Sequence, residues 1–262
     1  MTGPTTEHVP VPVPKDALEY FRAKGIKVGF DYREVWAEEH ATSWTVAKAM
    51  RLDILEAIRS HVDEMIESGQ TFAQFKRELQ PLLEKLGWWG RGELLDPLSG
   101  ETREVQLGSP RRLRTIYDVN LRQAHAAGQW QRIERTRATQ PYLLYQLGPS
   151  REHRPEHVGW AGIILPADHS WWQSHFPPNG WGCKCWVRQI SKREAERLTA
   201  TGQYMTDAPD LGMQEYINQR TGQIVSVPKG IEPGWNYNPG AVSRKARAQQ
   251  LLEEKQPESD TA

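Results

Sequence analysis

The only two cysteines of the chain, Cys183 and Cys185, are separated by a single lysine and follow a stretch rich in histidine and tryptophan. Thiolates and imidazoles are the usual ligands of structural zinc, which binds four of them in a tetrahedron. The spacing allows both thiolates to face one ion, with two imidazoles completing the coordination. We therefore predict a structural zinc site formed by His157, His175, Cys183 and Cys185, with His153 as a further candidate ligand.

The same residues allow two other interpretations. A cysteine thiolate beside an imidazole is the nucleophile and base pair of thiol hydrolases, although no signature of such an enzyme surrounds these cysteines. Free cysteine is also a small hydrophobic residue that is common in protein cores, and the histidines can simply be hydrogen-bonded. A Cys-x-Cys pair differs from the usual Cys-x2-Cys zinc motif. The sequence therefore leaves the three interpretations open.

A second candidate site is a run of arginines on a long predicted helix, residues 110–137. Such side chains contact DNA phosphates or an acidic partner, although long arginine side chains also cover apolar neighbours on an ordinary solvated helix. The chain has 33 basic and 33 acidic residues, and this balance argues against a general nucleic-acid coat protein. The residues predicted to contact DNA or a partner are Arg111, Arg112, Arg114 and Arg122.

Helical periodicity dominates the first half of the chain. Apolar residues recur at helical spacing over residues 46–68, and Thr71 to Gln74 forms a capping box that opens a second helix. A short link makes the two an antiparallel hairpin, and Pro81 is expected to kink or split the second helix. Ser109 followed by proline favours the start of the long helix, which is expected to bend at Gly128.

The pattern changes after residue 141. Residues 142–147 and 159–165 are predicted to be short strands, and residues 218–227 a hairpin, whereas residues 93–108 are predicted to be a loop. Helices that precede short strands favour an α+β fold over a parallel α/β sheet. The expected class is α+β, with an N-terminal helical part (a helix hairpin and a long central helix) and a small mixed module of short strands and a Cys/His/Trp-rich turn.

The expected domain order follows from these patterns. No run of 18 apolar residues is present, so no membrane span is expected, and the first residues lack the features of a signal peptide. We therefore expect a cytosolic protein. The predicted segments are a flexible arm (1–14), an N-terminal helical region (15–92), a core (108–190), a C-terminal helix, hairpin and Pro/Gly strap (191–245), and a tail (246–262).

Several motifs occur in an order that resembles a known family. The set comprises residues 109–117, Arg154, His157, Pro177, Pro178, Cys183 and Cys185. Taken in this order, they are similar to the phage head morphogenesis family named after the F protein of bacteriophage Mu. Lys184 stands where that family commonly has arginine, which is a mild departure. The resemblance covers about residues 15–245, and residues 108–190 correspond to the core of the family.

The resemblance implies a minor head protein of a tailed phage or prophage, which acts by binding in head morphogenesis. The partners that it implies are the portal protein and the major capsid or scaffold proteins, together with DNA for some members. It implies a location in the host cytoplasm during assembly and then in the phage head. The family implies no established enzymatic activity, so no catalytic residue is predicted. The alternative is a thiol- or metal-dependent hydrolase that acts during head maturation.

Overall fold

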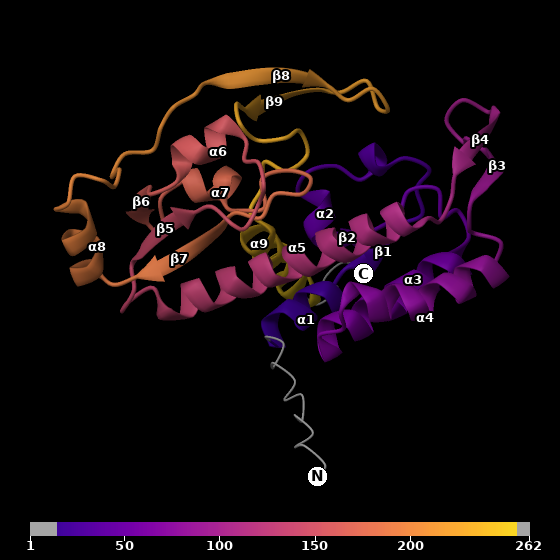
Figure 1. Cartoon of the computed structure of the whole chain (residues 1–262), viewed down its shortest axis with the longest axis horizontal. Helices are drawn as coiled ribbons and strands as arrows, with labels where there is room; N and C mark the ends of the chain where they lie inside the picture. Colours follow the sequence, from indigo (N-terminus) through magenta and orange to yellow (C-terminus); the bar gives the residue numbers. More distant parts are fainter. Residues whose placement is uncertain (1–14, 256–262) are drawn as a thin grey trace, which may run out of the picture.

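A computed structural model describes residues 15–255, so the predicted arm of residues 1–14 and the end of the predicted tail lie outside the described residues. Helix α5 (Pro110–Thr136) runs along the molecule and joins its two halves (Figure 1). Its N-cap is Ser109, whose hydroxyl accepts a hydrogen bond from the Arg112 amide. The helix is continuous through Gly128, where the missing side chain lets the backbone of α1 approach closely.

The N-terminal half packs helices on the first part of α5. These are α1 (Lys15–Arg22), α3 (Leu52–Ser68) and α4 (Phe72–Lys85), and α3 and α4 form the predicted antiparallel hairpin. The capping box of Thr71 and Gln74 is present at the start of α4. Pro81 does not split α4, because it lies on the exposed face of the helix, where water can reach the backbone carbonyl left without a partner.

Short elements complete this half of the molecule. Strands β3 (Arg91–Leu95) and β4 (Thr102–Gln106) form an antiparallel hairpin, so the prediction of a loop over residues 93–108 was wrong. Their side chains are mostly exposed and polar, and an apolar alternation that would indicate strands is therefore missing. The other elements are β1 (Gly25–Ile26), η1 (Tyr32–Glu34), α2 (Glu39–Thr42) and β2 (Ser43–Trp44), with β1 and β2 paired in parallel.

The second half is built on a three-stranded antiparallel sheet in the order β6-β5-β7. The strands are β5 (Tyr142–Gln146), β6 (Ile164–Pro166) and β7 (Trp186–Ile190). The strand predicted over residues 159–165 is therefore only partly correct, because proline at the first position of α6 starts a helix there. The surrounding helices are α6 (Pro155–Trp160), α7 (Trp171–His175) and α8 (Lys192–Thr199).

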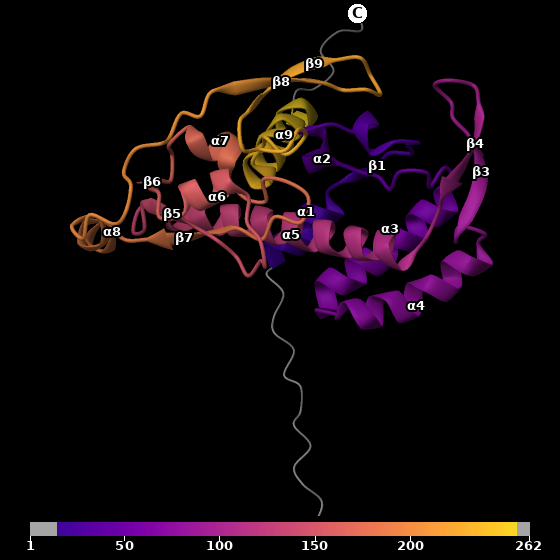
Figure 2. The same ribbon diagram turned by 45° about the horizontal axis from the view of Figure 1, so that its top comes forward.

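The C-terminal segment returns over both halves. The hairpin predicted over residues 218–227 is correct in its turn and second strand, but its first strand lies earlier in the chain. The strands are β8 (Met213–Ile217) and β9 (Ile224–Pro228), which arch over the molecule in both views (Figures 1 and 2). Helix α9 (Pro239–Lys255) packs on α5 and α2. The boundary expected at residue 245 consequently lies inside this helix.

Two hydrophobic cores share α5. The first contains Leu113 and Ile116 with the apolar faces of α1, α3 and α4, and the second contains Trp130 and Ile133 with the sheet, α6 and α7. The helical part and the Cys/His module are therefore joined by one helix rather than by a linker. The expected α+β class is confirmed. Within residues 15–255, no helix combines the length and apolarity needed to cross a membrane.

Candidate functional site

Three of the predicted metal ligands lie together at the edge of the second core. His157 is on α6, and Cys183 and Cys185 occupy the turn that leads into β7. Their ligand atoms all lie within 4.8 Å of one another. His157 Nδ1 is 3.8 Å from the Cys183 sulfur and 3.5 Å from the Cys185 sulfur. His157 and Cys183 are buried, at 2% and 4% exposure, whereas Cys185 is half-buried.

The ring of His157 is held by a hydrogen bond and by a stacking contact. Its Nε2 lies 3.0 Å from the carbonyl oxygen of Gly230, to which it donates a hydrogen bond. One face stacks on Trp160 with a centroid distance of 4.8 Å. Since Nε2 makes this bond, Nδ1 is the ring nitrogen that faces the two sulfur atoms.

The motif residues around the turn before β7 stabilise its conformation and do not line an open cleft. The Pro177–Pro178 peptide bond is cis, and it precedes a fully buried Asn179 that accepts a hydrogen bond from the Tyr145 hydroxyl at 3.1 Å. Arg154 donates to Glu232 at 2.8 Å and to the carbonyl of Trp181 at 3.1 Å. The backbone amide of Trp181 donates to the same carboxylate of Glu232 at 2.9 Å. Arg154 and Glu232 thereby hold the turn against the irregular segment that follows β9.

The two thiols shift each other's pKa in opposite directions. A hydrogen bond from Cys185, together with contact to His157, lowers the pKa of Cys183, although burial opposes this. The thiolate of Cys183 and burial in turn raise the pKa of Cys185. The chemistry available is that of a thiol with a lowered pKa beside an imidazole. This combination suits a metal ion or, where a substrate has access, a nucleophile.

The other predicted histidine ligands do not join this group. His175 packs against Trp160 with a centroid distance of 5.0 Å, stacks on Trp171 at 4.3 Å, and donates from Nδ1 to the carbonyl of Trp171 at 3.2 Å. Burial lowers the pKa of His175 to about 4, so it is neutral at physiological pH. His153 donates from Nε2 to the carbonyl of Gly148 at 2.9 Å. Both histidines therefore serve packing and hydrogen bonding in the part of the chain that the structure describes.

The four predicted contact arginines separate into two pairs. Arg112 donates to the carbonyls of Gln106 and Leu107 at 2.8 Å, and burial lowers its pKa to about 10. Arg122 donates to the carbonyl of Cys183 at 3.3 Å and so ties α5 to the Cys/His turn. These two side chains therefore hydrogen-bond to backbone carbonyls within the protein. The remaining pair, Arg111 and Arg114, is exposed on the first turns of α5.

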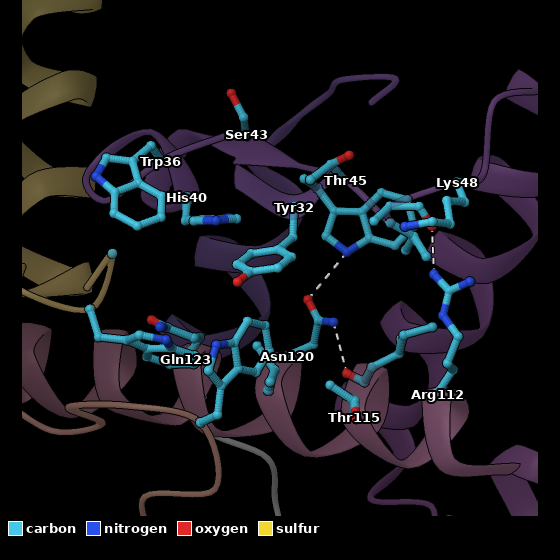
Figure 3. Close-up of a pocket in the computed structure, with 18 of the residues that line it drawn as sticks. Tyr32, Trp36, His40, Ser43, Thr45, Lys48, Arg112, Thr115, Asn120 and Gln123 are labelled. Carbon is cyan, nitrogen blue, oxygen red and sulfur yellow. Dashed lines mark hydrogen bonds between the residues drawn. The ribbon is translucent and has the colours of Figure 1, made fainter. Parts of the chain in front are cut away.

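A pocket of about 770 Å³ lies between α5 and the segment that contains η1, α2 and β2. Figure 3 shows Tyr32 and Thr45 entering it from one side and Asn120 and Gln123 from α5 on the other. Six tyrosine and tryptophan side chains line the walls, and Lys48, Arg111 and Arg112 add positive charge. Such walls suit a ligand or peptide with an apolar body and an anionic group.

Burial lowers the pKa of two basic groups that line this pocket. Lys24 donates to the carbonyl of His40 at 2.6 Å, and burial lowers the pKa of Lys24 to about 7. Burial and the neighbouring lysine lower the pKa of His40 to about 4. The side-chain carbonyl of Gln123 is buried and has no hydrogen-bond partner in the described structure. Sequence reasoning missed the pocket because separate segments form its walls.

A buried ion-pair network was also missed. Arg220, in the β8–β9 turn, donates to both carboxylate oxygens of Asp96 at 2.6 and 2.7 Å and also pairs with Glu34. The Asp96 side chain is 2% exposed and that of Arg220 is 10% exposed. Hydrogen bonds from Arg220 lower the pKa of Asp96 to about 2. No short motif indicates this network, because its members are 62 to 186 residues apart in the chain.

These observations describe an α+β protein whose motif residues hold a turn in place against a long central helix. The family model described as "Phage Mu protein F like protein" matches residues 56–188, about half of the chain. The chain therefore belongs to the family of Phage Mu protein F like proteins, and the resemblance drawn from its motifs is confirmed.

Two relatives show the extent of the similarity. "Putative capsid assembly protein F" of Escherichia phage Mu is 38% identical over 244 residues, which cover 88% of this chain and 55% of that protein. "Mu-like prophage FluMu F protein" of Haemophilus influenzae is 32% identical over 230 residues, covering 83% of this chain and 54% of the relative. The chain thus spans about half the length of these relatives. No solved structure matches it.

Proposed function

We propose that this chain is a head assembly protein of a tailed phage or prophage that acts by binding other head components. The observation that carries the proposal is the 38% identity, over 88% of the chain, to a protein named as a capsid assembly protein. The portal protein and the major capsid or scaffold proteins are its proposed partners. Its proposed location is the host cytoplasm during assembly and the phage head afterwards.

The geometry of the Cys/His turn supports a binding role rather than catalysis. Cys183 is 4% exposed, so a substrate would have to displace the turn to reach its sulfur. The turn is also tied to α5 through Arg122, as a structural element would be.

DNA is a further proposed partner, and the exposed pair on α5 supports it. Arg111 and Arg114 lie at the N-terminal end of this helix, where the helix dipole adds to their positive charge. Arg111 also lines the pocket beside α5. A phosphate chain that runs past this end of the helix would meet both guanidinium groups.

Deletion of the gene from an inducible phage, with complementation from a plasmid, tests the proposal. We expect the deletion to lower the yield of DNA-filled heads and the infective titre, and the wild-type plasmid to restore both. Electron microscopy of lysates separates failed assembly from failed DNA delivery. An unchanged titre and an unchanged number of filled heads would contradict a role in head assembly.

The alternative function is a thiol- or metal-dependent hydrolase acting during head maturation. One observation favours it: the Cys183 sulfur lies 3.8 Å from His157 Nδ1, within reach of a nucleophile and base pair. A hydrolase predicts that Cys183→Ser leaves folding intact but fails to complement the deletion. The assembly proposal predicts that any loss of complementation by this variant follows its loss of thermal stability. Thermal unfolding and complementation, measured on the same variant, separate the two functions.

A further inference from the structure

We propose that His157, Cys183 and Cys185 bind a zinc ion through Nδ1 and the two sulfur atoms, with a water molecule as the fourth ligand. The proposed ion holds the turn before β7 onto α6. This inference concerns the chain itself and does not depend on a role in head assembly.

The two sulfur-to-nitrogen distances fit a single ion, and all three ligand atoms lie within 4.8 Å of one another. Zinc–sulfur bonds of about 2.3 Å and zinc–nitrogen bonds of about 2.0 Å place sulfur and nitrogen about 3.5 Å apart in a tetrahedron. The two sulfur-to-nitrogen distances are 3.8 and 3.5 Å. Both therefore lie within about 0.3 Å of the spacing that a shared ion requires. A thiol–imidazole hydrogen bond would explain only one of the two contacts, because the single lone pair of Nδ1 accepts one hydrogen bond. A shared metal ion explains both.

The orientation of His157 is that of a metal ligand. In zinc sites, the ring nitrogen that does not bind the metal donates its proton to a carboxylate or a backbone carbonyl. The Nε2 of His157 makes this bond to the carbonyl of Gly230 at 3.0 Å. Stacking on Trp160 fixes the plane of the ring. The nitrogen that remains free for the metal points to both sulfur atoms.

The turn that carries the cysteines is held in place before any metal binds. Arg122 donates to the carbonyl of Cys183, and the backbone amide of Cys183 donates to the carbonyl of Gly180 at 3.1 Å. The carbonyl of Lys184 packs so closely on Gly148 that a side chain there would collide with it. A site whose ligands are positioned by such contacts loses little freedom on binding the ion.

The charges of the three ligands and the exposure of the site to water indicate what the fourth ligand is. Two thiolates and a neutral imidazole neutralise a divalent zinc ion, so the centre can be buried without an unpaired charge. The hydroxyl of Tyr145 already donates to Asn179 at 3.1 Å, and His175 faces Trp171. The described chain offers no further histidine, cysteine or carboxylate to the group. Since Cys185 is only half-buried, water reaches the ion from its side.

The test uses the full chain, purified under reducing conditions from cells grown with added zinc. Metal content is measured by inductively coupled plasma mass spectrometry. We expect about one zinc per chain in the wild type, and a loss of at least tenfold in Cys183→Ser and in Cys185→Ser. The control is His175→Asn, which alters a buried histidine of the same aromatic cluster that the proposal does not use. It should retain the zinc of the wild type.

A second measurement covers the case in which the serine variants fail to fold. Zinc is removed from the wild-type protein with a chelator, and thermal unfolding is followed before and after zinc is returned. We expect the metal-free protein to melt at least about 5 °C lower, and zinc but not magnesium to restore the melting temperature. Wild-type protein that contains no zinc and does not respond to added zinc would overturn the proposal. Retention of zinc by Cys183→Ser would overturn it as well.

Discussion

Gly148 is the position where the smallest change should cost the most stability. A Cβ atom added there would lie 1.8 Å from the carbonyl oxygen of Lys184 and 2.5 Å from its carbonyl carbon. Real Cβ atoms essentially never come within 3.0 Å of such a neighbour, so the two chain segments must separate by more than about 1 Å. The obstructing atoms are backbone, and a change of side-chain rotamer cannot relieve the collision.

The expected cost of Gly148→Ala follows from these contacts. Overpacking in a well-packed region costs about 1–3 kcal/mol, and a collision with backbone belongs at the upper end of this range. Loss of glycine flexibility in the unfolded chain returns about 0.4–1 kcal/mol. We therefore expect a net loss of about 2 kcal/mol in the free energy of unfolding. The displaced residue lies between Cys183 and Cys185, so the variant should also lose any metal that they bind.

Gly159→Ala is the matched control for this prediction. Gly159 lies on α6, two residues after His157, and an added Cβ there would have no neighbour within 4 Å. Alanine should stabilise this helix by up to about 1 kcal/mol. Urea unfolding followed by tryptophan fluorescence and circular dichroism measures both variants. Equal midpoints for the two variants would refute the packing that we describe around Lys184.

Three further predictions concern the ion-pair network, the first core and the basic surface. Asp96→Asn should lower the free energy of unfolding at neutral pH. The difference between variant and wild type should shrink as the pH falls from 3.8 towards about 2, because the wild-type carboxylate, whose pKa is lowered to about 2, becomes protonated over this range. Urea midpoints at several pH values check this. Ile58→Ala should cost about 2–5 kcal/mol in chemical unfolding, since Ile58 is fully buried. The double variant Arg111→Ala, Arg114→Ala should bind DNA with a shallower salt dependence in fluorescence anisotropy, and a salt-independent interaction of the wild type would indicate a protein partner.

Local signals predicted the helices well. Thr71 with Gln74, and Ser109 with the following proline, mark helix starts that the structure reproduces, because capping depends on residues only three positions apart. Pro81 was misjudged, since its effect depends on which face of the helix meets water. The β3–β4 hairpin was missed for a related reason, because its exposed strands lack an apolar alternation.

The candidate site could be predicted only in part. The pair of Cys183 and Cys185 with His157 was found from residue types, because thiols and imidazoles are rare and chemically distinctive. The separation of His175 from this group depends on how α6 and α7 pack around Trp160, which no local pattern specifies. The internal role of Arg112 likewise depends on carbonyls contributed by distant segments.

Quantitative mass spectrometry of purified procapsids and mature virions tests the central proposal most directly. Isotope-labelled peptides of this chain, counted against those of the major capsid protein, give its copy number per particle. A role in head assembly predicts a small and reproducible number of copies in procapsids. Presence in virions as well would indicate a minor structural component. Absence of the chain from both particles would contradict the proposal and direct attention to the Cys/His turn as an active site.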